Sequence, residues 1–462
     1  MSTEPGERHG ISLGEAFWVW LRVAALSFGG PAGQIAVMHR ILVEEKHWIG
    51  ETRFLHALNY CMLLPGPEAH QLAVYIGWLL HRIRGGILAG TLFILPGLLA
   101  LGALSLIYAV FGDIGFIGAL FFGLKAAVLA LVLQAVLRVG KRALKGPAQI
   151  TIAGLAFVAL FLFAVPFPLV IVLAGATGFL GNWFGVSAFQ AGLGHGGSSK
   201  GHNSPARIDA AFAKNIPAHV RPSFRRFMAV LVVGLAVWLS PLAALAASLG
   251  PRNTYTAIAA FNAKMAVLTF GGAYAVLAYM AQQAVEFYHW LQPGEMLVGL
   301  GFAETTPGPL ISVVQFVGFM ASFRDPGTLN PLVAGTLGGV LAMWMTFVPS
   351  FLWIFLGGPY VEALIGNKSL TAALNAITAA VVGVILNLAV WFGLHTLFGQ
   401  VETLHGYGLT MALPVLHTVN WAALVISLVA MVAMFRFKLG MIATLAGCSL
   451  LGIGCYLAFG VS

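Results

Sequence analysis

The sequence has little charge. Asp, Glu, Lys and Arg make up only 8% of its 462 residues, whereas soluble domains carry about 25%. Hydrophobic residues make up 59%, and the mean hydropathy is +0.91. So few charges cannot cover the surface of a water-soluble fold. The composition therefore excludes a soluble domain and predicts a polytopic membrane protein.

Cysteine is also scarce. Cys61, Cys448 and Cys455 are scattered through apolar segments and form neither a metal-ligand spacing nor a disulfide framework. The histidines show no metal-ligand spacing, and the chain lacks a phosphate-binding loop and a nucleophile–base motif. We therefore predict no metal, no cofactor and no enzymatic activity, and an ATP-driven pump is poorly supported.

The net charge of +9 has an ordinary explanation in a membrane protein. Lys and Arg gather in cytoplasmic loops. A nucleic-acid-binding protein needs a basic surface on a folded domain, and this sequence shows none. We expect the lipid bilayer, and no nucleic acid, among its partners.

Apolar runs fill most of the chain. About 20 apolar residues cross the hydrocarbon core. We count thirteen runs, near 14–39, 54–81, 86–111, 114–137, 148–164, 166–189, 227–249, 254–283, 295–323, 330–357, 371–398, 410–434 and 438–460. Proline and glycine interrupt some of them, which can then be re-entrant, so we expect about 10–13 membrane segments. The polar stretch 190–226 has the composition of a mobile linker.

The two halves of the chain are related. Phe28-Gly29-Gly30 and Phe270-Gly271-Gly272 are 242 residues apart, and Pro65-Gly66-Pro67 and Pro307-Gly308-Pro309 are separated by the same distance. Identical residues recur at this distance between the motifs: Glu44 and Glu286, His47 and His289, Trp48 and Trp290. The pattern indicates an internal duplication. We expect an N-terminal repeat over 1–189, a basic linker with one connecting span over 190–249, and a C-terminal repeat over 250–462.

The positions of Lys and Arg favour opposite orientations of the two repeats. Counting spans places Arg82, Arg84, the basic cluster 138–145 and the central linker on one side, which we expect to be the cytoplasm. Arg436 and Lys438 reach that side only when the second repeat is inverted. We therefore expect an all-α fold of two inverted-topology repeats.

The Phe-Gly-Gly (FGG) and Pro-Gly-Pro (PGP) motifs interrupt helical runs. Proline removes a backbone donor, and in a membrane the freed polar backbone must face protein or a water-filled cavity. Paired breaks at corresponding places in two repeats point to the binding site of a transporter. Since half-helix N-termini attract anions, we expect an anion to bind near mid-membrane. The motif residues expected to bind it are Phe28, Gly29, Gly30, Pro65, Gly66, Pro67, Phe270, Gly271, Gly272, Pro307, Gly308 and Pro309.

Cations accompany these breaks. Arg22 and Lys264 correspond in the two halves and lie in apolar surroundings, where a central charge costs about 2.5–3.5 kcal/mol and usually faces a cavity or a partner. We expect them to flank the anion; the alternative is that they snorkel to the interface. Lys125, with Asn375 as its apparent counterpart, either lines the pathway or lies at a helix end.

Carboxylates and neutral donors lie beside the breaks. Glu68 and Glu304 are candidates for proton coupling or for ion pairs with Arg22 or Lys264, although a carboxylate such as Glu68 at a helix N-terminus is often only a favourable partner of the helix dipole. The neutral side chains beside the breaks that could donate to an oxyanion are Gln34, Gln71, Thr305, Thr306, Ser312 and Gln315, although each alone is more often structural.

The combined motifs resemble a known family. Ser27 to Gly33, Leu64 to Glu68, Gln71 to Ala73 and Tyr75 to Trp78 resemble the first domain of the chromate ion transporters, the CHR family. The second-half segments that look like its second domain are Lys264, Thr269 to Gly272, Thr306 to Pro309 and Asn375-Ala376. The resemblance covers nearly the whole chain except the linker. Ala273-Tyr274 follows the second FGG motif where Pro31-Ala32 follows the first, so the two half-sites are not equivalent.

The resemblance implies a two-domain member that exports chromate from the bacterial cytoplasm across the inner membrane and confers chromate resistance by secondary transport. We expect alternating access, with one repeat rocking against the other. Two alternatives stay open. The first is uptake or exchange of sulfate, a dianion of similar shape, and the second is a passive anion channel. A homodimer is also possible.

Overall fold

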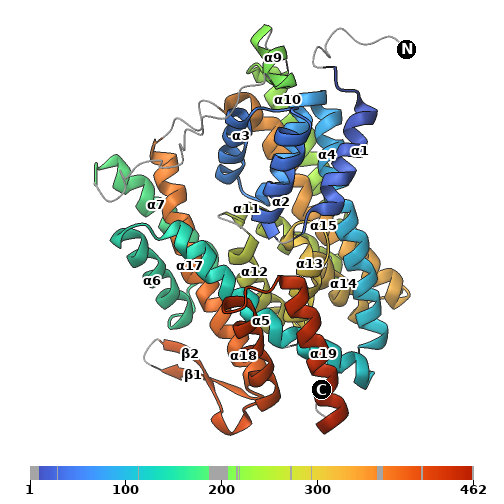
Figure 1. Cartoon of the computed structure of the whole chain (residues 1–462), viewed down its shortest axis with the longest axis vertical. Coiled ribbons are helices and arrows are strands. Elements are labelled where there is room, and N and C mark those ends of the chain that lie inside the picture. The colour runs from blue at the N-terminus through green and yellow to red at the C-terminus, as the bar shows by residue number, and fades with distance from the viewer. Residues whose placement is uncertain are drawn as a thin grey trace.

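The computed structural model describes residues 10–28, 30–112, 114–186, 206–214, 217, 219–270, 273–292, 294–361, 368–406 and 409–459. Within these ranges the chain is mostly helical (Figure 1). The expectation of an all-α fold is wrong at one place, where β1 (Val401–Gly406) and β2 (Leu409–Pro414) form an antiparallel hairpin with Val401 opposite Pro414. The apolar run expected at 410–434 is therefore divided, because proline at 414 ends the strand and α18 (Trp421–Phe435) begins beyond it.

Six helices in the described residues are long and apolar enough to cross a membrane. The first is α4 (Glu68–Phe111), which has 44 residues and contains non-helical backbone at His81 and Arg82. The others are α5 (Gly115–Ala143), α10 (Phe224–Leu249), α15 (Pro331–Gly357) with η4 (Gly358–Tyr360), α17 (Lys368–Leu397) and α19 (Met441–Phe459).

Short helices surround both FGG motifs. In the first half they are α1 (Leu13–Leu26), α2 (Gly30–His39), the π-helix η1 (Arg40–Glu45) and α3 (Glu51–Leu63). In the second half they are α11 (Thr254–Leu268), α12 (Ala273–Gln282), the π-helix η2 (Gln283–Phe287), α13 (Glu295–Thr305), η3 (Leu310–Val313) and α14 (Val314–Arg324). At 1.5 Å per residue, none of them alone reaches the roughly 30 Å of a hydrocarbon core.

These short helices follow one another in the same order in both halves. A π-helix comes after the FGG segment in each half, and the histidine that follows it has a positive φ, 50° at His47 and 54° at His289. The Nδ1 atoms of these histidines lie 2.8 Å and 3.0 Å from the carbonyl oxygens of Val43 and Val285. The two segments therefore repeat in local geometry as well as in sequence.

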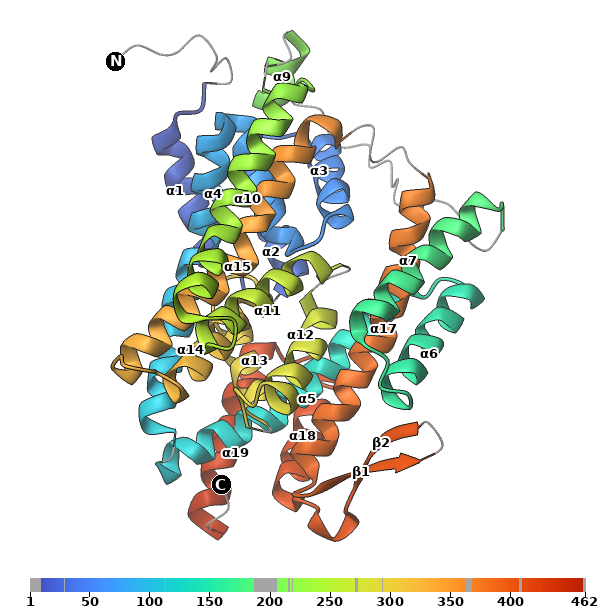
Figure 2. The ribbon, with the colours of Figure 1, turned by 180° about the vertical axis from the view of Figure 1, so that it is seen from behind.

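The last helices of each half pack against the long helix of the other half. In the first half, α6 (Pro147–Phe161) and α7 (Phe167–Trp183) pack against α17, whereas α18 and α19 of the second half pack against α5. Figures 1 and 2 show this exchange, with α6 and α7 beside α17. One large apolar core accordingly combines residues from both halves.

The connecting helix α10 lies on the outside of the molecule (Figure 2). It packs against α11 and α15. Its other apolar side chains are exposed, for example Val232 at 65% and Val233 at 62%, as expected for a helix that faces lipid. The short helix α9 (Arg207–Lys214) precedes it in the linker.

The crossing of α5 and α19 depends on small residues. A Cβ atom built at Gly123 would lie 2.1 Å from the carbonyl oxygen of Cys448, whereas one at Gly447 on α19 would meet nothing within 4 Å. We expect Gly123→Ala to destabilise the protein by about 1–3 kcal/mol because the helices must separate. Thermal unfolding of the purified protein measures this, with Gly447→Ala as control. Equal melting temperatures for the two variants would contradict the close approach.

Candidate functional site

Each PGP motif is hydrogen-bonded to the segment before the FGG motif of the other half. The amide of Gly66 donates to the carbonyl of Thr269 at 2.7 Å, and the amide of Gly308 donates to the carbonyl of Ser27 at 2.9 Å. Gly66 and Gly308 are 242 residues apart, as are Ser27 and Thr269. The two contacts are therefore the same contact made twice, and we call them the PGP–FGG junctions.

Glycine is required at the centre of each junction. The φ angles of Gly66 and Gly308 are 126° and 122°, a region that side-chain-bearing residues rarely adopt. A Cβ atom at Gly66 would also lie 2.7 Å from the Nε2 atom of Gln71 and 3.0 Å from the hydroxyl of Ser350. The prolines on either side fix the chain direction, so the motif presents its single amide to the opposite half.

Four helices begin at the junctions. α2 begins at Gly30, the last residue of the first FGG motif, and α12 begins at Ala273, directly after the second, while α4 and η3 begin directly after the PGP motifs. Pro67 and Pro309 are the N-caps of α4 and η3, and neither helix has a side-chain cap. Helix N-termini carry about half a positive charge. The junctions therefore gather positive potential from helix N-termini of both halves, which Glu68, the first residue of α4, partly offsets.

A buried glutamine donates to a backbone carbonyl of each PGP motif. Gln34 Nε2 donates to the carbonyl of Gly308 at 2.5 Å, and Gln71 Nε2 donates to the carbonyl of Pro65 at 2.7 Å. Both glutamines are 0% exposed. Within the described residues, their Oε1 atoms and the hydroxyls of Ser312 and Ser350 are buried without a hydrogen-bond partner. Uncompensated polar atoms in such a place are typical of a site that a polar ligand enters.

The long helices α4 and α15 close around the junctions. A Cβ atom at Gly97, on α4, would lie 2.6 Å from the carbonyl oxygen of Pro307, and the Ser350 hydroxyl of α15 faces Gly66. Sequence reasoning missed Ser27, Thr269, Gly97 and Ser350. Ser27 and Thr269 could have been found, because both directly precede the FGG motifs and lie 242 residues apart. Gly97 and Ser350 lie far along their helices and had no such signal.

Arg22 and Lys264 have different partners. Arg22 on α1 pairs with Glu45 on η1 at 2.6 Å, and the two side chains are 50% and 36% exposed. Lys264 on α11 donates to the hydroxyl of Tyr279 at 2.9 Å, and its Nζ atom lies 5.3 Å from the centroid of that ring. Among the described residues the two cations share no hydrogen-bond partner. That they flank one anion stays a prediction.

Lys125 and Asn375 also lie apart from the junctions. Lys125, on α5, is partly buried, with Nζ 3.6 Å from the position of a Cβ atom at Gly294 and with Glu295 as its electrostatic partner. Glu295 itself accepts hydrogen bonds from Arg324 and Tyr108. Asn375 is exposed on α17. Their predicted role in binding is untested.

The remaining predicted site residues are found in several environments. Glu68 is the first residue of α4 and interacts electrostatically with Arg142, while Glu304 on α13 is 5% exposed. Thr306 caps α13 and is buried. Phe28 is partly buried, and Phe270 packs against the large core. Gly29, Gly271 and Gly272 lie outside the described residues.

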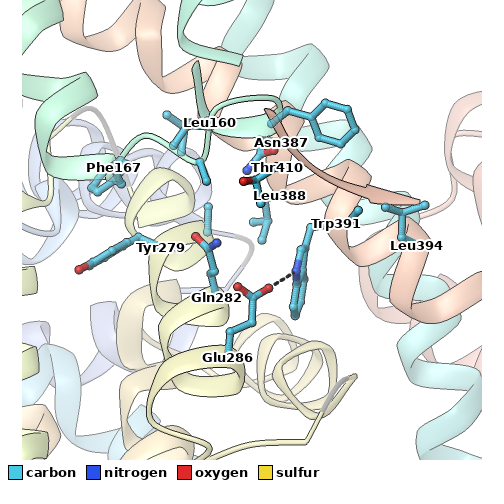
Figure 3. A pocket seen from close by; sticks show the side chains of 15 residues that line it. Leu160, Phe167, Tyr279, Gln282, Glu286, Asn387, Leu388, Trp391, Leu394 and Thr410 are labelled. Atoms are coloured by element: carbon cyan, nitrogen blue, oxygen red, sulfur yellow. Dashed lines mark hydrogen bonds between the residues drawn. The ribbon is translucent and has the colours of Figure 1, made fainter. Parts of the chain in front are cut away.

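A pocket of about 150 Å³ opens between α12, α17 and the α6–α7 connection (Figure 3). Gln282, Glu286 and Asn387 line it, and the Glu286 carboxylate accepts a hydrogen bond from Trp391 Nε1 at 2.9 Å. The ring of Tyr279 forms one wall, with its hydroxyl directed away from the pocket. The pocket lining contains the Glu286 carboxylate and neither Lys nor Arg, whereas the junctions bring together helix N-termini from both halves, so the junctions are the better candidate for an anion site.

Most of the chain matches one family. The family model described as "Chromate transporter" matches residues 14–179 and 256–453. The chain belongs to the chromate transporter family. Its two-part match coincides with the two sets of repeated helices, and it covers both FGG and both PGP motifs. A member of the chromate transporter family whose described residues include six long apolar helices is a multi-pass membrane protein and not an enzyme.

Named relatives agree with this assignment. The chain is 31% identical over 377 residues to a chromate transport protein of Pseudomonas aeruginosa, a match covering 81% of this chain and 80% of that protein. It is 26% identical over 376 residues to a chromate transport protein of Cupriavidus metallidurans, covering 81% of each. No solved structure was found to match the chain.

We predict that Gly308→Ala reduces chromate transport at least about tenfold, because alanine at this φ adds about 1–3 kcal/mol of strain and disrupts the junction. Gly327→Ala is the control: Gly327 also has a positive φ, 61°, but a Cβ atom there meets nothing within 4 Å. Initial rates of chromate flux measure the effect. Equal rates for the two variants would show that junction geometry is dispensable.

Proposed function

We propose that this protein is a secondary transporter that exports chromate from the cytoplasm across the bacterial inner membrane and thereby confers chromate resistance. The observation that carries the proposal is the reciprocal pairing of the two PGP–FGG junctions in the core of the molecule. The names of the relatives from Pseudomonas aeruginosa and Cupriavidus metallidurans support chromate as the substrate.

Recognition of the oxyanion begins with backbone groups. The helices α2, α4, α12 and η3 direct their N-termini to the junctions, and helix N-termini bind oxyanions through free N–H groups. The unpartnered hydroxyls of Ser312 and Ser350 are further donors. Neutral donors of this kind release a dianion more readily than a fixed ion pair does, as transport requires.

The cations add attraction at the approaches to the junctions. Lys264 is held by Tyr279, a neutral partner, so its charge is not offset and acts on an incoming anion. Arg22 is offset by Glu45 in this conformation. We infer that the dianion displaces the Glu45 carboxylate from Arg22 in the course of transport, since both are oxyanions that fit a guanidinium.

The two halves are proposed to be inverted repeats. In each junction a residue of one half contacts a residue of the other, and the same contact recurs with the halves exchanged, as a two-fold axis requires. An axis in the membrane plane inverts one repeat, and the basic connections then lie on the cytoplasmic side, the linker among them. The domains are a repeat over 1–189, a linker with a connecting span over 190–249 and a repeat over 250–462.

Sulfate is the second candidate substrate. Backbone N–H groups and hydroxyls read the shape and charge of a tetrahedral dianion, which sulfate shares with chromate, and do not contact its central atom. Uptake or exchange of sulfate would use the same junctions. A passive channel is less well supported, because backbone hydrogen bonds between the halves close the junctions in this conformation.

Transport by inverted vesicles tests the proposal. We expect chromate accumulation that saturates, and an increase in KM for Lys264→Ala and Arg22→Ala because each removes a cation near the approach. Arg436→Ala, an exposed residue after α18, should behave like the wild type. Non-saturating flux would favour a channel, and stronger competition by sulfate than by unlabelled chromate would favour a sulfate transporter.

Proton coupling through Glu68 or Glu304 has its own test. If either carboxyl carries the coupled proton, Glu68→Gln or Glu304→Gln abolishes chromate accumulation driven by a pH gradient while leaving chromate counterflow intact. Glu402→Gln, in the peripheral hairpin, is the control. Undiminished gradient-driven accumulation in both variants would exclude these residues as the coupling site.

A further inference from the structure

A second cationic site lies away from the junctions. A pocket of about 290 Å³ is formed by α4, the segment before α10, α10 itself and α15. Arg82, His219 and Arg226 contribute its polar lining, and Trp78, Ile83, Val230 and Phe355 contribute its apolar lining. Among the residues that line it, none is acidic. The pocket is therefore positive at one end and apolar at the other.

Arg82 is held at this pocket by unusual backbone geometry. It lies at the kink of α4, where its φ is 56° and its ψ is −150°. Residues other than glycine rarely adopt such a conformation, because it strains the backbone. Arg82 lines the pocket from this strained position, so the fold retains a costly conformation at the residue that carries the charge.

The counterpart of Arg82 in the second half has a carboxylate partner, which Arg82 lacks. Arg324 ends α14 and lies 242 residues after Arg82, which ends the first segment of α4. Arg324 donates two hydrogen bonds to the buried carboxylate of Glu295, at 2.7 Å and 2.8 Å. The residue 242 before Glu295 is Arg53, another cation. In the first half, Arg53 therefore stands at the position of the acid that neutralises Arg324 in the second half.

The linker supplies a carboxylate partner for Arg53 but not for Arg82. Asp209 of α9 pairs with Arg53 and accepts a hydrogen bond from the amide of Gly50. No carboxylate in the described part of the chain pairs with Arg82. The pocket therefore offers a guanidinium whose anionic partner comes from outside the described chain.

The other polar groups of the pocket suit the same ligand. Arg226 donates to the carbonyl of His219 at 2.9 Å, which holds the segment before α10 to the first turn of α10. The His219 ring packs edge-on against Trp78, with the ring centroids 5.3 Å apart. Burial and the charges of Arg82 and Arg226 lower the pKa of His219 to about 4, so the ring is neutral at pH 7 and can donate one hydrogen bond.

The apolar lining indicates where the ligand comes from. Ile83 is 45% exposed, and Ile87, one turn further along α4, is 50% exposed. Val230 belongs to α10, the helix whose outer face carries exposed aliphatic side chains. A free inorganic anion gains nothing from such walls, whereas an acyl chain does. Basic pockets between membrane helices bind the headgroups of anionic lipids.

We propose that this pocket binds an anionic phospholipid, with the phosphate diester on Arg82, Arg226 and His219 and an acyl chain along Ile83, Val230 and Phe355. The lipid supplies the negative charge that Glu295 supplies in the second half. It also joins α10 and the segment before it to the kink of α4.

Native mass spectrometry of the full-length protein with phosphatidylglycerol or phosphatidylcholine tests this proposal. We expect phosphatidylglycerol to bind more tightly than phosphatidylcholine. We also expect Arg82→Gln to lower the affinity for phosphatidylglycerol at least about tenfold, because a charge-assisted hydrogen bond is lost. Arg84→Gln, an exposed arginine outside the pocket, is the matched control and should leave binding unchanged. Arg82→Gly removes the charge while relieving the strain, so it should lose lipid without losing stability.

Two further measurements distinguish a lipid headgroup from free inorganic phosphate as the ligand. Phe355→Ala shortens the apolar wall of the pocket and should lower the affinity for phosphatidylglycerol. Titration with inorganic phosphate should show no Arg82-dependent binding. Arg82-dependent binding of inorganic phosphate without lipid selectivity would overturn the lipid assignment in favour of a free anion. Equal lipid affinities for wild type, Arg82→Gln and Arg82→Gly would overturn the site altogether.

Discussion

Backbone polar groups have no partner in lipid, and this constraint shapes the centre of the protein. Each PGP motif interrupts a helix and leaves an amide that must be satisfied inside the membrane. The amides of Gly66 and Gly308 are satisfied by carbonyls of the opposite half, at Thr269 and Ser27. Neither half can bury its break alone. The same two hydrogen bonds that join the repeats also fix where the broken helices begin, and hence where positive potential gathers.

The repeats have diverged most in their charges. Arg22 is neutralised by Glu45, whereas Lys264, its counterpart, is held by the neutral Tyr279. Arg324 is neutralised by Glu295, whereas Arg82 faces a pocket without an acid in its lining. Asp209 of the linker offsets Arg53. The backbone framework is thus shared by both halves, while each half distributes its countercharges differently. Such asymmetry suits a transporter in which the two sides of the membrane impose different tasks.

Much of this arrangement could be predicted from the sequence, because the motifs at 28, 65, 270 and 307 recur with one spacing and their prolines and glycines break helices in only a few ways. The membrane class followed from composition. The hairpin 401–414 was missed, since the apolar residues of β2 join the run at 410–434 until Pro414 is considered, and β1 lies in no apolar run. The partners of Arg22 and Lys264 could not be predicted either. Side-chain pairing depends on how η1 and α12 turn back toward α1 and α11, and that geometry leaves no pattern in the sequence.

The central claim is that a tetrahedral oxyanion binds at the PGP–FGG junctions. The most direct measurement is the anomalous scattering of chromium in crystals of the protein grown with chromate. We expect a chromium peak beside Gly66 and Gly308, within reach of the N-termini of α4 and η3. A peak confined to the Arg82 pocket or to the pocket of Glu286, with none at the junctions, would contradict it.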